Sequence, residues 1–255
     1  MTQAGKTDKE DKLILSRAED AIGQAERNYI IKSMGFLNPH ERSLISKNIL
    51  PPPDITISFE GGYNDAERAM LVCYPEFLVP DKDEILSVIK ITGRDLGTLT
   101  HRDYLGSIMG LGITRENIGD ILVSQDGAFV FVRCEIADYI INNLEKIGRR
   151  GIKTELCRCS DADIPEPKFK EINGTVSSLR LDAVVALAAG ISRSKAAELI
   201  GQELISVNFE TVTSVSAQVS EGDLISARGF GRTRLNRIGN ITRKGRISVT
   251  LLRYE

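Results

Sequence analysis

Four consecutive residues near the end of the chain, Ser192, Arg193, Ser194 and Lys195, have the side chains needed to bind an anion. Ser192 precedes a short apolar segment with helical spacing, so its hydroxyl can cap that helix by accepting an N–H group of the first turn. The other free N–H groups and the aligned peptide dipoles favour negative charge at a helix start. An arginine and a lysine at the same end add charged donors. The stretch therefore predicts a site for a phosphate group.

A second arginine stands at the start of a neighbouring helix. The short apolar segment 181–189 follows Arg180, and Gly190 separates it from the segment that begins at Ser192. Asp182 lies in its first turn, where a carboxylate would repel phosphate, so we expect Asp182 to cap or orient rather than to contact an anion. Two short helices with basic starts are expected to form one cationic surface.

The sequence after the two helices alternates in a way that predicts strands. Residues 204–208 and 224–228 are rich in β-branched and apolar residues, and eight basic residues without an acidic one follow from Arg228 to Arg253. Apolar residues alternate with these basic ones, which is typical of strands with one apolar and one basic face. The residues expected to extend the cationic surface are Arg228, Arg232 and Arg234.

The formal net charge of −2 conceals a separation of charge along the chain. Residues 1–79 carry 9 Lys and Arg against 12 Asp and Glu, a balance of −3, and residues 80–167 carry 11 against 15, a balance of −4. Residues 168–255 carry 13 against 8, a balance of +5. A basic module joined to acidic segments indicates that one part of the molecule binds a polyanion.

The first 79 residues predict a small domain of helices and a β-hairpin. Apolar residues at three- and four-residue intervals predict a helix over 6–34. Asn38, Pro39 and Glu41 have the order of an N-cap, a first helical residue and a capping-box partner, so a second helix should begin there and end before Pro51. Strands are expected at 55–59 and 69–74.

Residues 80–160 predict a second domain with the order βαββαβ, the ferredoxin-like arrangement that RNA-recognition modules share with many other domains. Phe129 and Phe131 alternate on its third strand, so they could stack nucleobases on an open sheet face or pack in the core. The first strand has no aromatic residue, which favours the core. The predicted elements are a strand at 85–92, a helix at 100–111, strands at 118–123 and 128–133, a helix at 137–147 and a strand at 152–159.

Three arginines around the first helix of this domain, Arg94, Arg102 and Arg115, are candidate secondary contacts to phosphate. The alternative is a set of ion pairs with neighbouring carboxylates, and the sequence does not decide between the two. Those carboxylates are Asp95, Asp103 and Asp120.

Other kinds of chemistry lack the residues they would need. The four cysteines are not spaced as a disulfide framework or a zinc module, and we expect no metal, no cofactor and no small-molecule substrate. Because no apolar run is long enough to cross a bilayer and the chain starts with charged residues, we expect a cytoplasmic protein. We also expect a monomer. Residues 161–167, with two prolines, are expected to link the central domain to a third domain at 168–255.

The last third of the chain resembles the RNA-binding domain named after ribosomal small-subunit protein four, called the S-four domain below. The resemblance rests on Arg-Leu-Asp at 180–182, Ser-Arg-Ser-Lys-Ala at 192–196, Leu-Ile at 199–200, Val-Asn at 207–208 and Gly-Asp-Leu-Ile-Ser at 222–226. It implies a compact basic face that binds structured RNA through phosphates and shape. Phe209 departs from the pattern, because the family often has glycine there. The residues expected to bind RNA are Arg180, Ser192, Arg193, Ser194, Lys195, Asn208, Arg228, Arg232 and Arg234.

The central segment is similar to the bacterial YlmH family. His-Arg-Asp-Tyr-Leu-Gly at 101–106, Gly-Ile-Thr-Arg at 112–115 and Ile-Gly-Asp-Ile at 118–121 precede the S-four domain, and Arg-Gly-Phe-Gly-Arg closes the series at 228–232. This resemblance implies a protein of ribosome-associated quality control that binds large ribosomal subunits carrying peptidyl-tRNA. It also implies an association with the cell-division gene neighbourhood.

The expected function is therefore non-enzymatic binding of rRNA and tRNA on the large ribosomal subunit. An RNA-modifying enzyme is the main alternative. The Arg-Leu-Asp triplet that a pseudouridine synthase would need starts a helix of the S-four domain, however, and the βαββαβ order offers no doubly wound methyltransferase unit. A protein-binding scaffold for cell division is the second alternative. The expected fold class is α+β, with a helix-plus-hairpin domain, a ferredoxin-like domain and an S-four domain.

Overall fold

The computed structural model of this chain describes residues 3–64, 66–159 and 169–254, with side chains from residue 9 onward. The chain divides into two compact units, residues 1–165 and 166–255, which are described separately. The linker predicted at 161–167 lies outside the described residues. No described helix is both long enough and apolar enough to cross a membrane.

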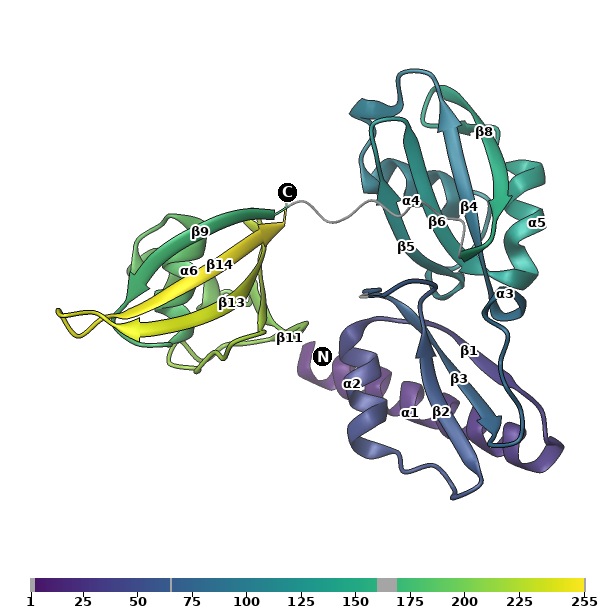
Figure 1. Cartoon of the computed structure of the whole chain (residues 1–255), viewed down its shortest axis with the longest axis horizontal. Helices are drawn as coiled ribbons and strands as arrows, with labels where there is room; N and C mark the ends of the chain where they lie inside the picture. Colours follow the sequence, from purple (N-terminus) through teal and green to yellow (C-terminus); the bar gives the residue numbers. More distant parts are fainter. Residues whose placement is uncertain (1–2, 65, 160–168, 255) are drawn as a thin grey trace. The chain divides into compact units, whose positions relative to one another are not determined.

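The first lobe of the first unit is a three-stranded antiparallel sheet covered by two helices (Figure 1). Asn38 caps α2 and shares a capping box with Glu41, as the sequence predicts. The prediction of helix as far as residue 34 is wrong: α1 ends at Asn28, Tyr29 has a φ of 54°, and residues 32–37 form a strand paired with β3. Pairing and burial of this apolar segment outweigh its helical spacing. The elements are α1 (Gln3–Asn28), β1 (Lys32–Leu37), α2 (Pro39–Asn48), β2 (Ile55–Glu60) and β3 (Ala69–Pro75).

The second lobe has the predicted ferredoxin-like fold. Its strands lie in the order β5-β6-β4-β8-β7, all antiparallel, so the first and third strands of the βαββαβ unit are central. The second helix ends at Asn143 rather than at residue 147, and an added short strand, β7, pairs with β8. The elements are α3 (Lys82–Ile85), β4 (Leu86–Gly93), η1 (Leu96–Thr98), α4 (His101–Met109), η2 (Arg115–Asn117), β5 (Ile118–Val123), β6 (Gly127–Arg133), α5 (Cys134–Asn143), β7 (Lys146–Ile147) and β8 (Arg150–Cys157).

Both faces of this five-stranded sheet are covered. On one face Ile89 and Val130 pack in a core with α4 and α5. On the other face Phe129 and Phe131 are 9% and 0% exposed and share a core with residues of the first lobe, including Phe36. The nucleobase-stacking interpretation of these two phenylalanines is therefore wrong, and the core-packing alternative is confirmed. The shared core joins the two lobes into one unit.

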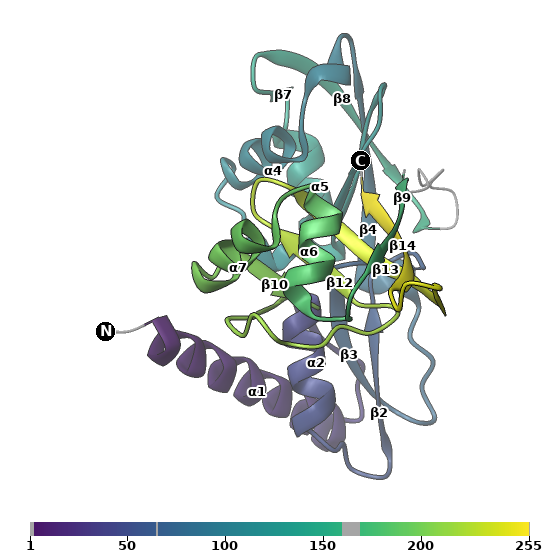
Figure 2. The ribbon, with the colours of Figure 1, turned by 90° about the vertical axis from the view of Figure 1, so that its left-hand side faces the viewer.

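The second unit is a six-stranded antiparallel sheet with α6 and α7 packed on one face (Figure 2). Thr233, Leu235, Val249 and Leu251 are buried on that face, and alternation turns the intervening residues of β13 and β14 to the open face. The strand order is β11-β10-β12-β13-β14-β9. The elements are β9 (Phe169–Val176), α6 (Leu181–Ala189), α7 (Arg193–Gly201), β10 (Ile205–Val207), β11 (Glu210–Thr211), β12 (Leu224–Ala227), β13 (Gly231–Ile241) and β14 (Ile247–Tyr254). The expected fold class is confirmed.

Candidate nucleic-acid interface

A buried carboxylate brings two predicted contact arginines together in the second unit. Asp182 Oδ1 lies 3.1 Å from Arg180 Nε, and Asp182 Oδ2 lies 2.6 Å from Arg193 Nη2. The Asp182 side chain is only 7% exposed, whereas those of Arg180 and Arg193 are 37% and 50% exposed. Asp182 therefore orients the two guanidinium groups, and each keeps donors that face solvent. We call Arg180, Asp182 and Arg193 the arginine clamp.

The local sequence explains why the arginine clamp forms. Arg180 is the N-cap of α6, Asp182 lies in the first turn of that helix, and Arg193 is the first residue of α7. Gly190 ends α6 with a φ of 67°, a left-handed conformation that favours glycine, and so the chain can turn directly into α7. Burial opposes ionisation of Asp182. Hydrogen bonds from Arg180 and Arg193 outweigh this effect, and the pKa of Asp182 lies below its ordinary value.

The start of α7 also has the predicted cap. Ser192 Oγ accepts a hydrogen bond from the Lys195 backbone N–H at 3.2 Å. Ser192, Ser194 and Lys195 are exposed, and Lys195 Nζ lies 2.9 Å from Glu198. An ion pair between two exposed side chains three residues apart is weak. Lys195 can therefore leave Glu198 and bind an external anion.

Asn208 stabilises a turn of the second unit. Asn208 and Phe209 form the two-residue turn between β10 and β11, with φ values of 49° and 70°. The Asn208 amide donates to Asp223 at 2.8 Å and accepts from the Leu224 N–H at 3.0 Å. Both polar ends of the amide are used within the protein, so we leave Asn208 out of the proposed interface. Phe209 adopts the left-handed conformation that glycine would adopt in such a turn.

Arg228, Arg232 and Arg234 lie away from the arginine clamp. Arg228 is exposed in the loop after β12, while Arg232 and Arg234 lie on the open face of the sheet because their neighbour Thr233 is buried against the helices. The Arg232 guanidinium lies 5.7 Å from the centre of the Tyr254 ring, close enough for a cation–π interaction. Phe169 packs edge-on against Tyr254, with 4.8 Å between ring centres.

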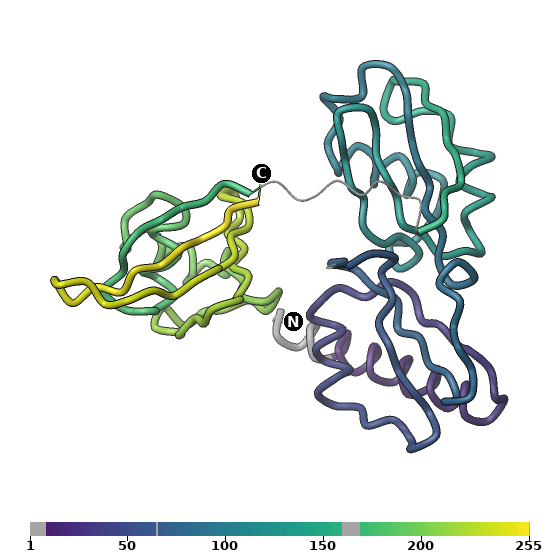
Figure 3. Tube along the Cα trace, in the orientation of Figure 1, coloured from purple at the N-terminus to yellow at the C-terminus, as the bar shows by residue number. Residues whose placement is uncertain are grey.

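Arg232 and the arginine clamp lie near opposite ends of β9. Tyr254 pairs with Phe169 at one end, and Val176 pairs with Ile247 at the other, where the chain continues to α6 (Figure 3). Seven residue steps along a strand span about 23 Å, so Arg232 lies in a region of the module that is separate from the arginine clamp.

Arg246 lies close to the arginine clamp, although nothing in the sequence distinguishes it from the other basic residues of the β13–β14 hairpin. Its guanidinium donates to the Thr175 hydroxyl at 2.9 Å and to the Thr175 carbonyl at 2.5 Å. Arg193 lies 3.4 Å from the Ser177 hydroxyl, only two positions further along the chain. The antiparallel pairing of β9 with β14, which the sequence does not specify, places Arg246 there.

The three arginines predicted in the central domain separate into two environments. Arg94 and Arg102 are exposed. Arg115 instead donates to the backbone carbonyls of Ile118 and Gly119, the latter at 3.1 Å. Burial, together with repulsion from Arg68, lowers the pKa of Arg115 to about 10. Arg115 therefore supports the fold and is left out of the proposed interface.

Arg115 belongs to a polar network where the two lobes of the first unit meet. Asp120 is 9% exposed and accepts hydrogen bonds from the Tyr63 hydroxyl at 2.8 Å and the Glu67 N–H at 2.7 Å. Arg68 from the first lobe donates to the Ile118 carbonyl at 3.2 Å. Burial raises the pKa of Asp120 despite these hydrogen bonds. Of the two roles left open for Arg115, pairing with a neighbouring carboxylate therefore fits this network better than contact with phosphate.

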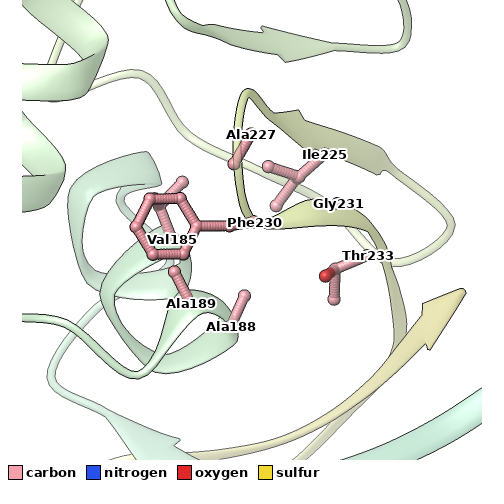
Figure 4. Close-up of a pocket in the computed structure, with 8 residues that line it drawn as sticks. All are labelled: Val185, Ala188, Ala189, Ile225, Ala227, Phe230, Gly231 and Thr233. Carbon is pink, nitrogen blue, oxygen red and sulfur yellow. The ribbon is translucent and has the colours of Figure 1, made fainter. Parts of the chain in front are cut away.

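Metal-ligating groups, thiols and one pocket bear on catalysis among the described residues. No group of three His, Cys, Asp or Glu side chains among them is placed to hold a metal ion. Burial raises the pKa of the Cys73 thiol to about 12 and that of Cys159 to about 11, so both thiols are protonated at neutral pH. A small pocket is lined by eight described residues, including Val185, Phe230 and Thr233, none of which is ionisable (Figure 4).

Comparison with known proteins places these features in a family. Residues 82–161 match the family model described as "Putative RNA-binding domain in YlmH". Residues 179–225 match the S4 domain, the S-four domain that the sequence predicts. The solved structure of cell division protein ylmH from Streptococcus pneumoniae has a similar fold, with a TM-score of 0.52 and 23% identity over 61% of this chain and 95% of that chain. Ribosome-associated protein quality control protein P2 of Bacillus subtilis (strain 168) is 33% identical over 249 residues, which cover 97% of this chain and 96% of that protein. Because this relative matches over nearly its whole length, the chain belongs to the YlmH family.

Proposed function

We propose that this chain is a non-enzymatic, cytoplasmic RNA-binding protein. It binds rRNA and tRNA on the large ribosomal subunit and acts in ribosome-associated quality control of stalled peptidyl-tRNA complexes. The name of the Bacillus subtilis relative, a ribosome-associated quality control protein, supports the biological setting. The two matched domain families support RNA as the ligand.

The observation that carries the proposal is the arginine clamp. A nearly buried carboxylate holds two half-exposed guanidinium groups in a fixed relative position at the starts of two helices. An arginine fork held in advance loses less side-chain entropy when it binds phosphate, and it presents paired donors. Ser192, Ser194 and Lys195 lie beside it in sequence, and Arg246 lies nearby. Arg228, Arg232 and Arg234 provide a second contact region of the same module.

The surroundings of Asp182 argue against the alternative that this chain is a pseudouridine synthase. Asp182 is the carboxylate of the Arg-Leu-Asp triplet, and it is nearly buried and bound to two arginines. A catalytic carboxylate would need to reach its substrate. A double variant, Arg180→Ala/Arg193→Ala, distinguishes the RNA-binding function from a cell-division scaffold. A scaffold would keep its cellular function in this variant, whereas an RNA-binding protein would lose it.

The direct test measures binding of the full chain to large ribosomal subunits that carry peptidyl-tRNA, over a range of salt concentrations. Removing one contact to phosphate flattens the plot of log K against log salt by about 0.9 on the duplex-DNA scale, so Arg193→Ala should flatten it by about that amount. The matched control is Arg27→Ala, which removes an exposed arginine from the end of α1. Salt-insensitive binding, or equal slopes for the two variants, would contradict the proposal.

A further inference from the structure

Six basic residues gather at one end of the five-stranded sheet, although the lobe that carries them lies in an acidic part of the chain. They come from the end of β4, the start of α4 and the β7–β8 hairpin, which are far apart in sequence. We call this group the hairpin patch. Its members are Arg94, Arg102, Lys146, Arg149, Arg150 and Lys153.

The fold holds these segments together through several contacts. Gly93, next to Arg94, pairs with Ile152 of β8. The Arg150 guanidinium donates to the Asp95 carbonyl, and the Gly148 N–H in the hairpin turn lies 3.3 Å from the Ser107 hydroxyl of α4. β7 packs beside α4, and Figure 2 shows both near the same end of the lobe. The patch is therefore built by tertiary contacts between three segments.

The charge of the hairpin patch remains largely available to a ligand. Five of its six residues are exposed, and Arg150 is partly buried. Two carboxylates lie among them. Asp103 accepts hydrogen bonds from the Thr100 N–H and hydroxyl, both at 2.7 Å, and those bonds hold its pKa below the ordinary value. Asp95 is the other. Glu145 and Glu155 follow on the flanking segments, and exposed Asp126 lies in the β5–β6 turn beside Gly127, which pairs with Thr92 of β4. The six cations therefore outnumber these five carboxylates by one.

Within the described part of this domain, neither face of the sheet is open to RNA. Its sheet is covered on one face by α4 and α5 and on the other by the first lobe, which buries Phe129 and Phe131. A base-stacking platform of the RNA-recognition type is therefore closed. The same domain nevertheless matches a family model for RNA binding over residues 82–161. All six residues of the hairpin patch fall within that range.

We infer that the hairpin patch is a second RNA-binding surface, which binds the phosphate backbone of a structured RNA. The inference rests on the proposed function, because it assigns a surface of the first unit to the same ligand class as the arginine clamp. Cations presented without an exposed aromatic ring suit phosphates rather than unstacked bases. Paired RNA, with regularly spaced phosphates, is therefore the expected ligand, and single-stranded RNA is expected to bind less well.

The test uses the full chain and an RNA hairpin with a fully paired stem as the probe. Arg94→Gln/Arg102→Gln/Arg149→Gln removes three exposed charges from the hairpin patch. The control, Lys9→Gln/Arg27→Gln/Lys47→Gln, removes three exposed charges from α1 and α2 of the same unit. In the patch variant, the slope of log K against log salt should be smaller in magnitude by about 2–3, and binding should weaken about tenfold or more. The control variant should match the wild type. Equal thermal unfolding of the two variants would show that both fold.

A comparison with Arg193→Ala distinguishes failure of this inference from failure of the proposed function. If the patch variant binds like its control while Arg193→Ala weakens binding, the hairpin patch is not an RNA surface and the proposed function stands. If Arg193→Ala has no effect but the patch variant weakens binding, the hairpin patch is supported and the arginine clamp is overturned. Photocrosslinking of the wild type should place RNA on peptides that contain residues 94–102 or 146–153. Crosslinks that avoid both segments would overturn the inference.

Discussion

Asp182 illustrates how one buried residue can control the behaviour of two exposed ones. It is a negative charge within a basic surface, so charge counting suggests that it weakens RNA binding. The structure indicates the opposite, because its two oxygens orient Arg180 and Arg193. When RNA contacts both guanidinium groups directly, the benefit of holding them in a fixed orientation should exceed the repulsion between RNA and the Asp182 charge.

Asp182→Asn should therefore weaken RNA binding although it makes the protein more positive. We expect a loss of about 1 kcal/mol, or roughly fivefold in Kd, since one strong acceptor for the two guanidinium groups is removed. The matched control is Glu198→Gln, which changes the charge equally but only frees Lys195 from a surface ion pair. Binding by Glu198→Gln should be unchanged or tighter. Tighter binding by Asp182→Asn would show that orientation does not matter.

The depressed pKa of Asp182 also predicts a pH dependence of stability. A carboxyl group whose folded pKa is below its unfolded value, about 3.9, stabilises the fold above that value and loses this effect as pH falls through the folded pKa. The free energy of unfolding of the wild type should exceed that of Asp182→Asn by a constant amount above about pH 5. The difference should shrink below about pH 4. A difference that is independent of pH down to acid denaturation would contradict this account.

Turns and close approaches between elements depend on single residues. The turn between β10 and β11 places Phe209 at a φ of 70°, where an L-residue other than glycine costs about 1–2 kcal/mol. Phe209 is partly buried, but it does not belong to the core that α6 and α7 form with the sheet. The residue that the family pattern would place here is thus better suited to the local backbone than the one present.

Phe209→Gly should raise the free energy of unfolding by up to about 1 kcal/mol, because relief of the turn exceeds the added entropy of glycine in the unfolded chain. Urea denaturation of the full chain measures the change. Phe209→Ala is the control, since it removes the ring and keeps the unfavourable conformation. If Phe209→Ala is as stable as Phe209→Gly, the turn conformation carries no measurable cost.

The junction of the two lobes depends on a glycine that lets β5 approach β1. A Cβ atom at Gly119 would stand 2.5 Å from the ring of Phe36, which is 1% exposed. Gly119→Ala should lower the free energy of unfolding by about 1–3 kcal/mol through overpacking. Gly106→Ala, in α4, meets nothing within 4 Å and should raise stability by up to about 1 kcal/mol. If both substitutions change the free energy of unfolding in the same direction, the close packing of Gly119 against Phe36 is contradicted.

At the scale of the whole molecule, charge is divided between the two parts of the chain. Residues 1–167 have a balance of −3 plus −4, or −7, while residues 168–255 have a balance of +5. A net negative first unit is expected to reduce indiscriminate attraction of the whole chain to RNA. Two separate basic surfaces on one chain can also select an RNA that offers phosphates to both.

Combining Arg193→Ala with the triple variant of the hairpin patch tests this division. If both surfaces contact the same RNA independently, their losses in binding free energy should add within about 0.5 kcal/mol. Titration of the same paired RNA hairpin with the single, triple and combined variants measures the sum. A combined variant no weaker than the weaker of its parents would show that the two surfaces do not act on one RNA together.

Local sequence determined much of this protein. The cap at Ser192, the capping box of Asn38 with Glu41, the two short helices and the βαββαβ order follow from side chains within a few residues of one another. Charge balance, being a sum over sequence, placed the basic module correctly at the end of the chain. Local hydrogen bonds and hydrophobic spacing have short range, so a single sequence can report them.

Only the tertiary structure decided which distant residues share a surface. Pairing of β9 with β14 separated Arg232 from the arginine clamp and brought Arg246 near it. Packing of the first lobe buried Phe129 and Phe131, and contacts across three segments assembled the hairpin patch. The helix predicted through residue 34 became β1 for the same reason. Strand pairing and burial join residues far apart in sequence, and one sequence alone does not specify those partners.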